Sequence, residues 1–268
     1  MVTLHQDIPK TISADNTRRA TRLAHIVQAV NQRHFMTLRE IAETFGVNMQ
    51  TARRDVAYLD QQKHLRKTHG GAVAQEEPDA LSIQARLNLH ETDKQRIAQA
   101  AAAYVEDEDI IYLDGASTTA YIAPHLLNKR LHVVTNFLPL SATLQSGWPD
   151  VEVILTGGYY YPRSGILLGP PAVQTIQHMS INKVFMGAAG VTRDGIYNAN
   201  MLVVALEQAV IAHAASVYLL VDSSKFDNAS LMHICGLERI HTIITNAQPP
   251  DDICIAAADA GCKIHICA

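Results

Sequence analysis

The chain has 268 residues, 48% of them hydrophobic, which gives ample core for one small and one medium domain. No signal peptide is recognisable and no apolar run reaches the about 18 residues that span a bilayer, so we expect no membrane partner and a reducing cytoplasm. Residues 1–75 carry 11 basic and 6 acidic side chains, a net charge of +5, whereas the remainder carries 11 basic and 20 acidic ones, a net charge of −9. A basic head on an acidic body predicts that only the head meets a polyanion.

Residues 1–16 show no periodicity and are predicted to form a flexible arm. Two amphipathic helices follow, because apolar side chains recur at i, i+3, i+4 and i+7. The first covers roughly 17–31. The second is shorter, begins with a capping box made by Thr37 and Glu40, and ends at the left-handed turn that Gly46 permits.

A third helix contains residues 51–60, TARRDVAYLD, and Asn48 is expected to cap it. Its apolar stripe is Ala52, Val56 and Leu59. The opposite face carries Gln50, Thr51, Arg53 and Arg54, which suit the edges and phosphates of a DNA major groove. We expect the neighbouring Asp55 to orient an arginine by ion pairing beside that face.

Residues 65–74, LRKTHGGAVA, predict a hairpin with a basic tip. Three helices and such a hairpin make a winged helix-turn-helix over residues 17–75, although two arginines alone are more often a solvated face. The predicted DNA contacts are Thr37, Asn48, Gln50, Thr51, Arg53, Arg54, Tyr58, Arg66, Lys67 and His69.

Residues 76–90 are acidic, contain Pro78 and predict a linker, with room for a short helix. Residues 91–268 then alternate strands with helices, which predicts an α/β domain with a mainly parallel sheet covered on both faces. The expected strands are 110–114, 132–135, 151–156, 183–187, 217–222, 242–245 and 263–267. The expected helices are 92–105, 118–127, 137–146, 171–178, 201–214 and 250–260.

The carboxyl ends of these strands are rich in Gly, Ser, Thr and Asn. Ligands bind at that edge of a parallel sheet, and glycines, hydroxyls and a helix start suit a phosphate. The predicted effector-binding residues are Asp114, Gly115, Ala116, Ser117, Thr118, Thr119, Thr135, Asn136, Gly157, Gly158, Gly187 and Lys225. Each loop alone is an ordinary turn; Asp114 can equally cap a helix and Lys225 can be a surface lysine.

No nucleotide cofactor is expected, since neither GxxxxGK[ST] nor GxGxxG occurs. No metal site is expected either. Cys262 and Cys267 flank His265, but the segment alternates like a terminal strand, and no CxxC occurs. Buried free thiols are the favoured interpretation.

The motifs TARRD, RKTHGGA, LDGASTT, VVTN, LTGG and LVDSSKF occur in this order along nearly the whole chain. Together they resemble the DeoR family of bacterial transcriptional regulators. The resemblance implies a winged helix-turn-helix joined to a sugar-phosphate sensor similar to the ribose-phosphate isomerase fold. Segments 135–140 and 195–208 look most like the branch that contains the ascorbate-utilisation repressor, which implies a sugar-acid or pentose phosphate ligand.

Two functions are weighed. The first is a DNA-binding repressor of a carbohydrate-catabolism operon, released from double-stranded operator DNA by a phosphorylated sugar or sugar acid. It would act as a homodimer or homotetramer, because one short helix reads too few base pairs, and would join the nucleoid when bound. The second is a sugar-phosphate isomerase or deaminase carried on a DNA-binding head, with Asp114, Glu207 and Lys225 as acid and base groups. We favour the first and expect no enzyme.

Overall fold

The computed structural model describes residues 14–33, 35–62, 64–67, 70–74, 82–127, 129–145 and 151–267. The chain divides into two compact units, Met1–Ala80 and Leu81–Ala268. Most of the expected arm, residues 1–13, lies outside the described residues. Each unit has its own hydrophobic core.

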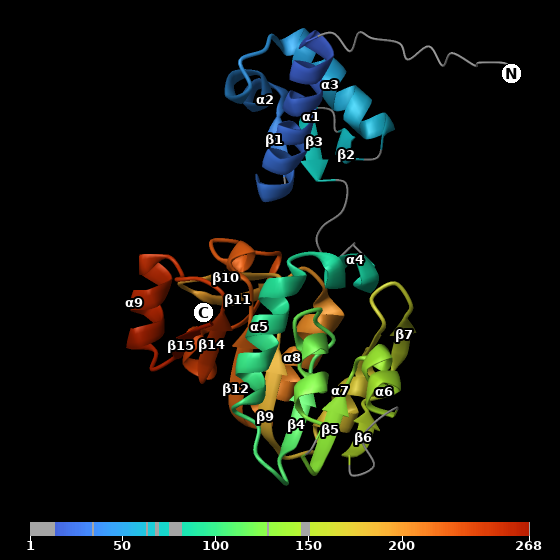
Figure 1. Cartoon of the computed structure of the whole chain (residues 1–268), viewed down its shortest axis with the longest axis vertical. Helices are drawn as coiled ribbons and strands as arrows, with labels where there is room; N and C mark the ends of the chain where they lie inside the picture. The colour runs from blue at the N-terminus through green and yellow to red at the C-terminus, as the bar shows by residue number, and fades with distance from the viewer. Residues whose placement is uncertain are drawn as a thin grey trace, which may run out of the picture. The chain divides into compact units, whose positions relative to one another are not determined.

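The first unit contains the three expected helices and the expected hairpin (Figure 1). Its elements are α1 (Ala14–Arg33), β1 (Phe35–Thr37), α2 (Leu38–Thr44), α3 (Met49–Gln61), β2 (Leu65–Lys67) and β3 (Gly71–Ala74). The apolar stripes meet in one core, with Ile26, Val30, Ile41 and Val56 all fully buried. The helix-turn-helix prediction is confirmed, and α1 begins slightly earlier than its apolar pattern indicated.

Local caps set the ends of α2 and α3 as the sequence predicts. The Thr37 hydroxyl accepts the Glu40 backbone N–H at 3.1 Å, and the Glu40 carboxylate accepts the Thr37 N–H at 2.7 Å. Gly46 takes a φ of 62° after α2, and the Asn48 side chain accepts the Thr51 N–H at 2.8 Å. Each cap pairs backbone groups that a helix end leaves without intrahelical partners.

Strand β1 was not expected from the sequence. It pairs antiparallel with β3, so the small sheet has the order β1-β3-β2. Three residues are too few to show the period-2 pattern of a strand. A Cβ at Gly71 would lie 2.2 Å from the Met36 carbonyl oxygen, so this close pairing requires glycine.

The second unit is built on a seven-stranded sheet with the order β15-β14-β12-β9-β4-β5-β6, and every pairing in it is parallel. All seven expected strands are present. They are β4 (Ile110–Leu113), β5 (Leu131–Thr135), β6 (Val151–Leu155), β9 (Ile181–Met186), β12 (Ala214–Leu220), β14 (Thr242–Thr245) and β15 (Lys263–Ile266).

Both faces of this sheet are covered. Ile111, Tyr112 and Leu113 are consecutive in β4 and at most 1% exposed. Since successive side chains of a strand point to opposite faces, the sheet is buried on both sides. The helices of this unit are α4 (Ile83–Asn88), α5 (Glu91–Ala102), α6 (Leu138–Gln145), α7 (Pro170–Ile176), α8 (Met201–Ala212) and α9 (Asp251–Asp259).

One predicted helix is wrong. Residues 118–127 form two short 3₁₀ turns, η2 (Thr119–Tyr121) and η3 (Ala123–His125). Pro124 has no N–H to donate and its ring crowds the carbonyl four residues earlier, so an α-helix cannot run through this segment. Helix α4 lies inside the range that the sequence assigns to the linker.

Two small antiparallel sheets were missed. One pairs β7 (Tyr159–Tyr161) with β8 (Ile166–Leu168). The other has the order β10-β11-β13, formed by β10 (Gly190–Thr192), β11 (Gly195–Asn198) and β13 (Met232–Cys235). Strands of three or four residues carry little periodic signal.

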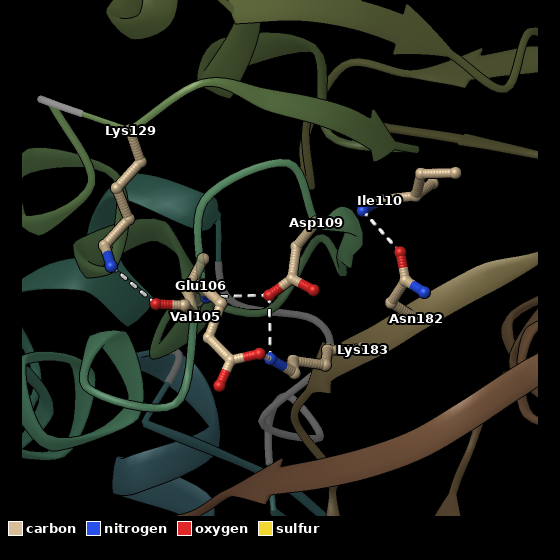
Figure 2. A network of polar contacts seen from close by, with 7 residues as sticks. All are labelled: Val105, Glu106, Asp109, Ile110, Lys129, Asn182 and Lys183. Carbon is tan, nitrogen blue, oxygen red and sulfur yellow. Dashed lines mark hydrogen bonds and ion pairs between the residues drawn. The ribbon is translucent and has the colours of Figure 1, made fainter.

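The amino ends of β4 and β9 are tied together by polar contacts (Figure 2). The Lys183 ammonium lies 2.8 Å from an Asp109 carboxylate oxygen and 3.1 Å from one of Glu106. The Ile110 N–H donates to the Asn182 side chain at 2.7 Å. These bonds fix the amino ends of the strands. The candidate ligand residues lie at the opposite edge of the sheet, at the carboxyl ends.

Candidate functional site

The face of α3 opposite its core stripe is exposed. Ala52, Val56 and Leu59 are buried, as expected, whereas Gln50, Arg53 and Arg54 are exposed and Thr51 is half-buried. Two guanidinium groups and an amide thus point away from the core on one rigid helix. This arrangement can donate hydrogen bonds to phosphates and to base edges.

Asp55 does pair with arginine, but not beside the exposed face. Its carboxylate is 3% exposed and accepts a hydrogen bond from Arg22 Nε at 2.9 Å, with Arg19 Nε at 3.8 Å. Both arginines belong to α1. The expected ion pair with an arginine is therefore confirmed, but its expected place beside the DNA-facing side of α3 is wrong: the carboxylate joins α3 to α1 inside the head.

Tyr58 is 41% exposed, and the Arg19 guanidinium lies 4.9 Å from the centre of its ring. Thr37 uses its hydroxyl and its backbone N–H in the cap of α2. Since the Asn48 side chain caps α3, the expected DNA contacts include three residues whose side chains already have defined partners in the head.

The hairpin of β2 and β3 follows α3 directly. The Lys67 backbone N–H donates to the Asp60 carboxylate at 2.9 Å, which fixes β2 to the end of α3, and the Lys67 side chain is exposed. His69 and the side chain of Arg66 lie outside what the structure describes. The hairpin itself confirms the predicted wing.

In the second unit, the loops after β4, β5 and β9 are joined by side chains predicted to bind ligand. Asp114 accepts the Gly115 N–H at 2.6 Å and the Gly187 N–H at 3.3 Å, one with each carboxylate oxygen. The Asn136 side chain accepts the Gly115 N–H at 3.0 Å. These residues, far apart in the sequence, meet at the carboxyl edge of the sheet as expected.

Two of the predicted threonines support the loops from inside. The Thr119 hydroxyl donates to the carbonyls of Asp114 and Ala116 at 2.7 Å. The Thr135 hydroxyl donates to the Leu113 carbonyl at 2.6 Å and is fully buried. Thr118 is also buried, whereas Ala116 and Ser117 are half-buried. A 3₁₀ turn begins here in place of the expected helix, so an anion would meet a smaller aligned dipole.

Three glycines in these loops are required by their backbone. Gly157 and Gly158 have φ values of 72° and 108°, and a Cβ at Gly158 would lie 2.4 Å from the Leu168 carbonyl oxygen. A Cβ at Gly187 would lie 2.6 Å from the Ala116 Cβ. Gly157 is favoured by its left-handed backbone, whereas Gly158 and Gly187 are also needed for close approach to neighbouring segments.

Lys225 lies in the short turn η4 (Ser223–Lys225), which the Asp222 side chain caps by accepting the Ser224 N–H at 3.0 Å. It is half-buried, so it is not simply a surface lysine. The loop after β12 therefore carries a half-buried cation and, three residues earlier, a buried carboxylate that caps its turn.

A second lysine lies within electrostatic reach of Lys225 and Asp222 and was missed. Lys94 lies on α5 and is 4% exposed. Burial lowers its pKa to about 8; the nearby charge of Asp222 opposes this, and those of Lys225 and Arg86 add to it. The sequence held a signal, since Lys94 occupies the buried stripe with Ile97, Ala98 and Ala101 at i, i+3, i+4 and i+7.

Beneath the Asp114 loop, Tyr112 is fully buried, and its hydroxyl has no hydrogen-bond partner among the described residues. Burial raises its pKa well above the ordinary value, helped by the negative charges of Asp114 and Glu207. Both carboxylates are themselves buried. The floor of the loop cluster is thus acidic and poorly solvated.

Within the described ranges, no three His, Cys, Asp or Glu side chains form a group that would hold a metal ion. Cys262 and Cys267 are free thiols and buried, which agrees with the interpretation from their sequence pattern. Among the described helices, none combines the length and the apolarity that a membrane crossing needs.

Comparisons with known proteins match both units. A family model described as the DeoR-like helix-turn-helix domain matches residues 22–77, and one described as the DeoR C terminal sensor domain matches residues 89–247. These matches confirm the resemblance that the motifs suggested.

The similar proteins are regulators. The L-fucose operon activator of Haemophilus influenzae is 32% identical, over 85% of this chain and 92% of that protein. The glycerol-3-phosphate regulon repressor of Escherichia coli is 27% identical, over 90% of this chain and 96% of that protein. The regulator UlaR of Shigella dysenteriae is 29% identical, over 86% of this chain and 92% of that protein.

Among solved structures, a D-ribose-5-phosphate isomerase in complex with phospho-erythronic acid covers 51% of this chain and 54% of its own. Its sequence identity is 19% and its TM-score is 0.38. That likeness is too slight to carry any inference about chemistry.

Proposed function

The chain belongs to the DeoR family of transcriptional regulators, and we propose that it represses a carbohydrate-catabolism operon and leaves its operator when a phosphorylated sugar or sugar acid binds. We assign DNA binding to the first unit, Met1–Ala80, and effector sensing to the second unit, Leu81–Ala268, which includes α4. The observation that supports this best is that one chain carries both an exposed arginine face on α3 and, in a separate unit, a cluster of loops with a lysine.

On the DNA side, we assign base and phosphate contacts to Gln50, Thr51, Arg53 and Arg54, which share the outer face of α3. Lys67 lies at the wing. One α3 reads only a few base pairs, so two heads in a homodimer, or four in a homotetramer, would be needed for specificity among genomic sites.

On the sensor side, we assign the effector to the carboxyl edge of the sheet. Asp114, Asn136, Gly157, Gly158, Gly187 and Lys225 come from five loops, and Asp114 and Asn136 hold three of these loops together by hydrogen bonds. Lys225 supplies positive charge for a phosphate, and the charge of the nearby Lys94, which donates to carbonyls of α4, adds to it at a distance. The choice of a phosphorylated ligand follows from that charge; the E. coli relative is named for glycerol 3-phosphate.

The enzyme alternative has less support. Both oxygens of the Asp114 carboxylate accept backbone N–H groups, which fits a part in holding the loops better than proton transfer. We infer that the chain is no enzyme. Turnover of any member of a panel of sugar phosphates by the purified chain would overturn that inference.

The test of the proposal is fluorescence anisotropy with DNA from the region upstream of the gene, titrated at several salt concentrations. We expect tight, sequence-specific binding that weakens steeply with salt, since each phosphate that a lysine or arginine neutralises releases counterions and adds about one to the magnitude of the salt slope. Addition of the sugar phosphate that most raises the melting temperature of the chain should release the DNA. Binding that neither prefers that sequence nor depends on salt would sink the proposal.

A further inference from the structure

Helix α4 is short and has little core of its own. It has six residues, and none of its side chains is fully buried. A helix of this length is not stable alone, because nucleation costs more than its few hydrogen bonds return. Its helical state therefore depends on contacts from other elements.

Two side chains hold the carboxyl end of α4. The Lys94 ammonium donates to the carbonyls of Arg86 and Leu89. The Tyr121 hydroxyl donates to the Leu87 carbonyl at 3.2 Å. These are carbonyls of the last helical turn, which have no partners within the helix.

The amino end of α4 is held by a third loop. The Ile83 N–H donates to the Arg163 carbonyl at 2.9 Å, and the Ser82 hydroxyl caps the first turn by accepting the Ala85 N–H at 3.3 Å. Arg163 lies in the turn between β7 and β8, directly after the strand that follows Gly158. Tertiary bonds thus reach α4 at both ends.

The three groups that hold α4 all come from the neighbourhood of the candidate effector loops. Tyr121 ends the turn η2, which begins at Thr119 of the DGASTT segment. The charges of Asp222 and Lys225 shift the pKa of Lys94, which places Lys94 near the loop after β12. Arg163 belongs to the hairpin after Gly157 and Gly158.

The position of α4 in the chain gives these contacts a consequence. It is the first element of the second unit, and the DNA-binding unit ends its last strand at Ala74. We propose that α4 is a relay helix: Lys94 and Tyr121 are positioning residues that couple its helical state to the effector loops, and that state sets the DNA affinity of the head. Only the last step rests on the proposed function.

Amide hydrogen exchange of the full chain tests the first step without DNA or effector. Tyr121→Phe removes the hydroxyl, with its bonds to the Leu87 carbonyl and the Glu91 side chain, at nearly constant volume, and peptides covering residues 82–89 should exchange about two- to tenfold faster. Lys94→Met should act in the same direction and more strongly, since it removes two bonds to carbonyls at the end of α4 where Tyr121→Phe removes one. The matched control is Tyr104→Phe, which removes the hydroxyl that lies 2.9 Å from His265 Nδ1; among the described residues no hydrogen bond joins that hydroxyl to α4. Unchanged exchange of residues 82–89 in both test variants would overturn the coupling.

DNA affinity tests the second step. With upstream DNA as the probe, Tyr121→Phe should change the dissociation constant at least about threefold. Tyr104→Phe should lower the melting temperature of the chain as much as Tyr121→Phe does and leave the dissociation constant unchanged. A looser α4 with an unaltered dissociation constant means that α4 is only docked, and the relay is refuted. If the wild-type chain binds no DNA, the proposed function and the last step both fail, and the exchange data still decide whether the loops hold α4.

Discussion

Arg22 and Asp55 offer the sharpest test of how α3 is held. Replacing Arg22 by Met removes the 2.9 Å partner of the Asp55 carboxylate, which is 3% exposed in the intact head; the other ion pair of Asp55 among the described residues is with Arg19, at 3.8 Å. Breaking a fully buried pair costs about 3–5 kcal/mol. Because the Arg22 side chain is itself 25% exposed, we expect a smaller loss, about 2–3 kcal/mol. Arg19→Met should cost less than about 1 kcal/mol, since that side chain is 48% exposed.

The assay is amide hydrogen exchange across α3, because it reports the opening of the head separately from that of the sensor. Arg22→Met should speed exchange of the buried positions by about 30- to 150-fold. A double-mutant cycle with Asp55→Asn isolates the pair, and we expect a coupling free energy of about 1.5–3 kcal/mol. A coupling below about 0.5 kcal/mol, the size found for exposed pairs, would refute the view that this pair orients α3.

The remaining predictions concern the two sites and the stability of the sensor. Arg54→Ala should weaken operator binding by about 1–3 kcal/mol if Arg54 makes a bidentate base contact, measured by anisotropy against the exposed control Arg193→Ala. The pKa of Lys94 is about 8 in the folded chain against 10.5 when unperturbed. Between those two pH values the unfolded state binds more protons than the folded state, so this group makes the free energy of unfolding rise with pH. Lys94→Met should lose that rise in thermal melts, and an identical pH dependence in both proteins contradicts the assignment. Burial raises the pKa of Cys235 to about 12 and that of Cys262 to about 11, so both thiols should react with a maleimide or disulfide reagent only after unfolding, as mass spectrometry can report. Gly187→Ala should destabilise the sensor by about 1–3 kcal/mol in urea melts, because its methyl group would meet that of Ala116; full wild-type stability would show that these loops can separate at little cost.

The sequence determined what depends on neighbours along the chain. The caps at Thr37 and Asn48, the left-handed Gly46 and the buried stripe of α3 each involve residues only a few positions apart, and all are present. The seven parallel strands could be predicted from the sequence because strands buried on both faces are nearly continuous apolar runs. The pattern also placed Asp114, Asn136 and Gly187 at one edge of the sheet, since the carboxyl ends of parallel strands must meet there.

Tertiary structure alone decided which groups pair across long distances in the chain. Asp55 met Arg22, 33 residues away, on the inner side of α3, and Lys94 reached the carbonyls of α4 and the charge of Asp222. Local periodicity indicates which side of an element is buried, but not which group of another element the buried residue contacts. A charged residue on a buried stripe, such as Asp55 or Lys94, therefore signals a specific partner, and only the packed chain reveals its identity.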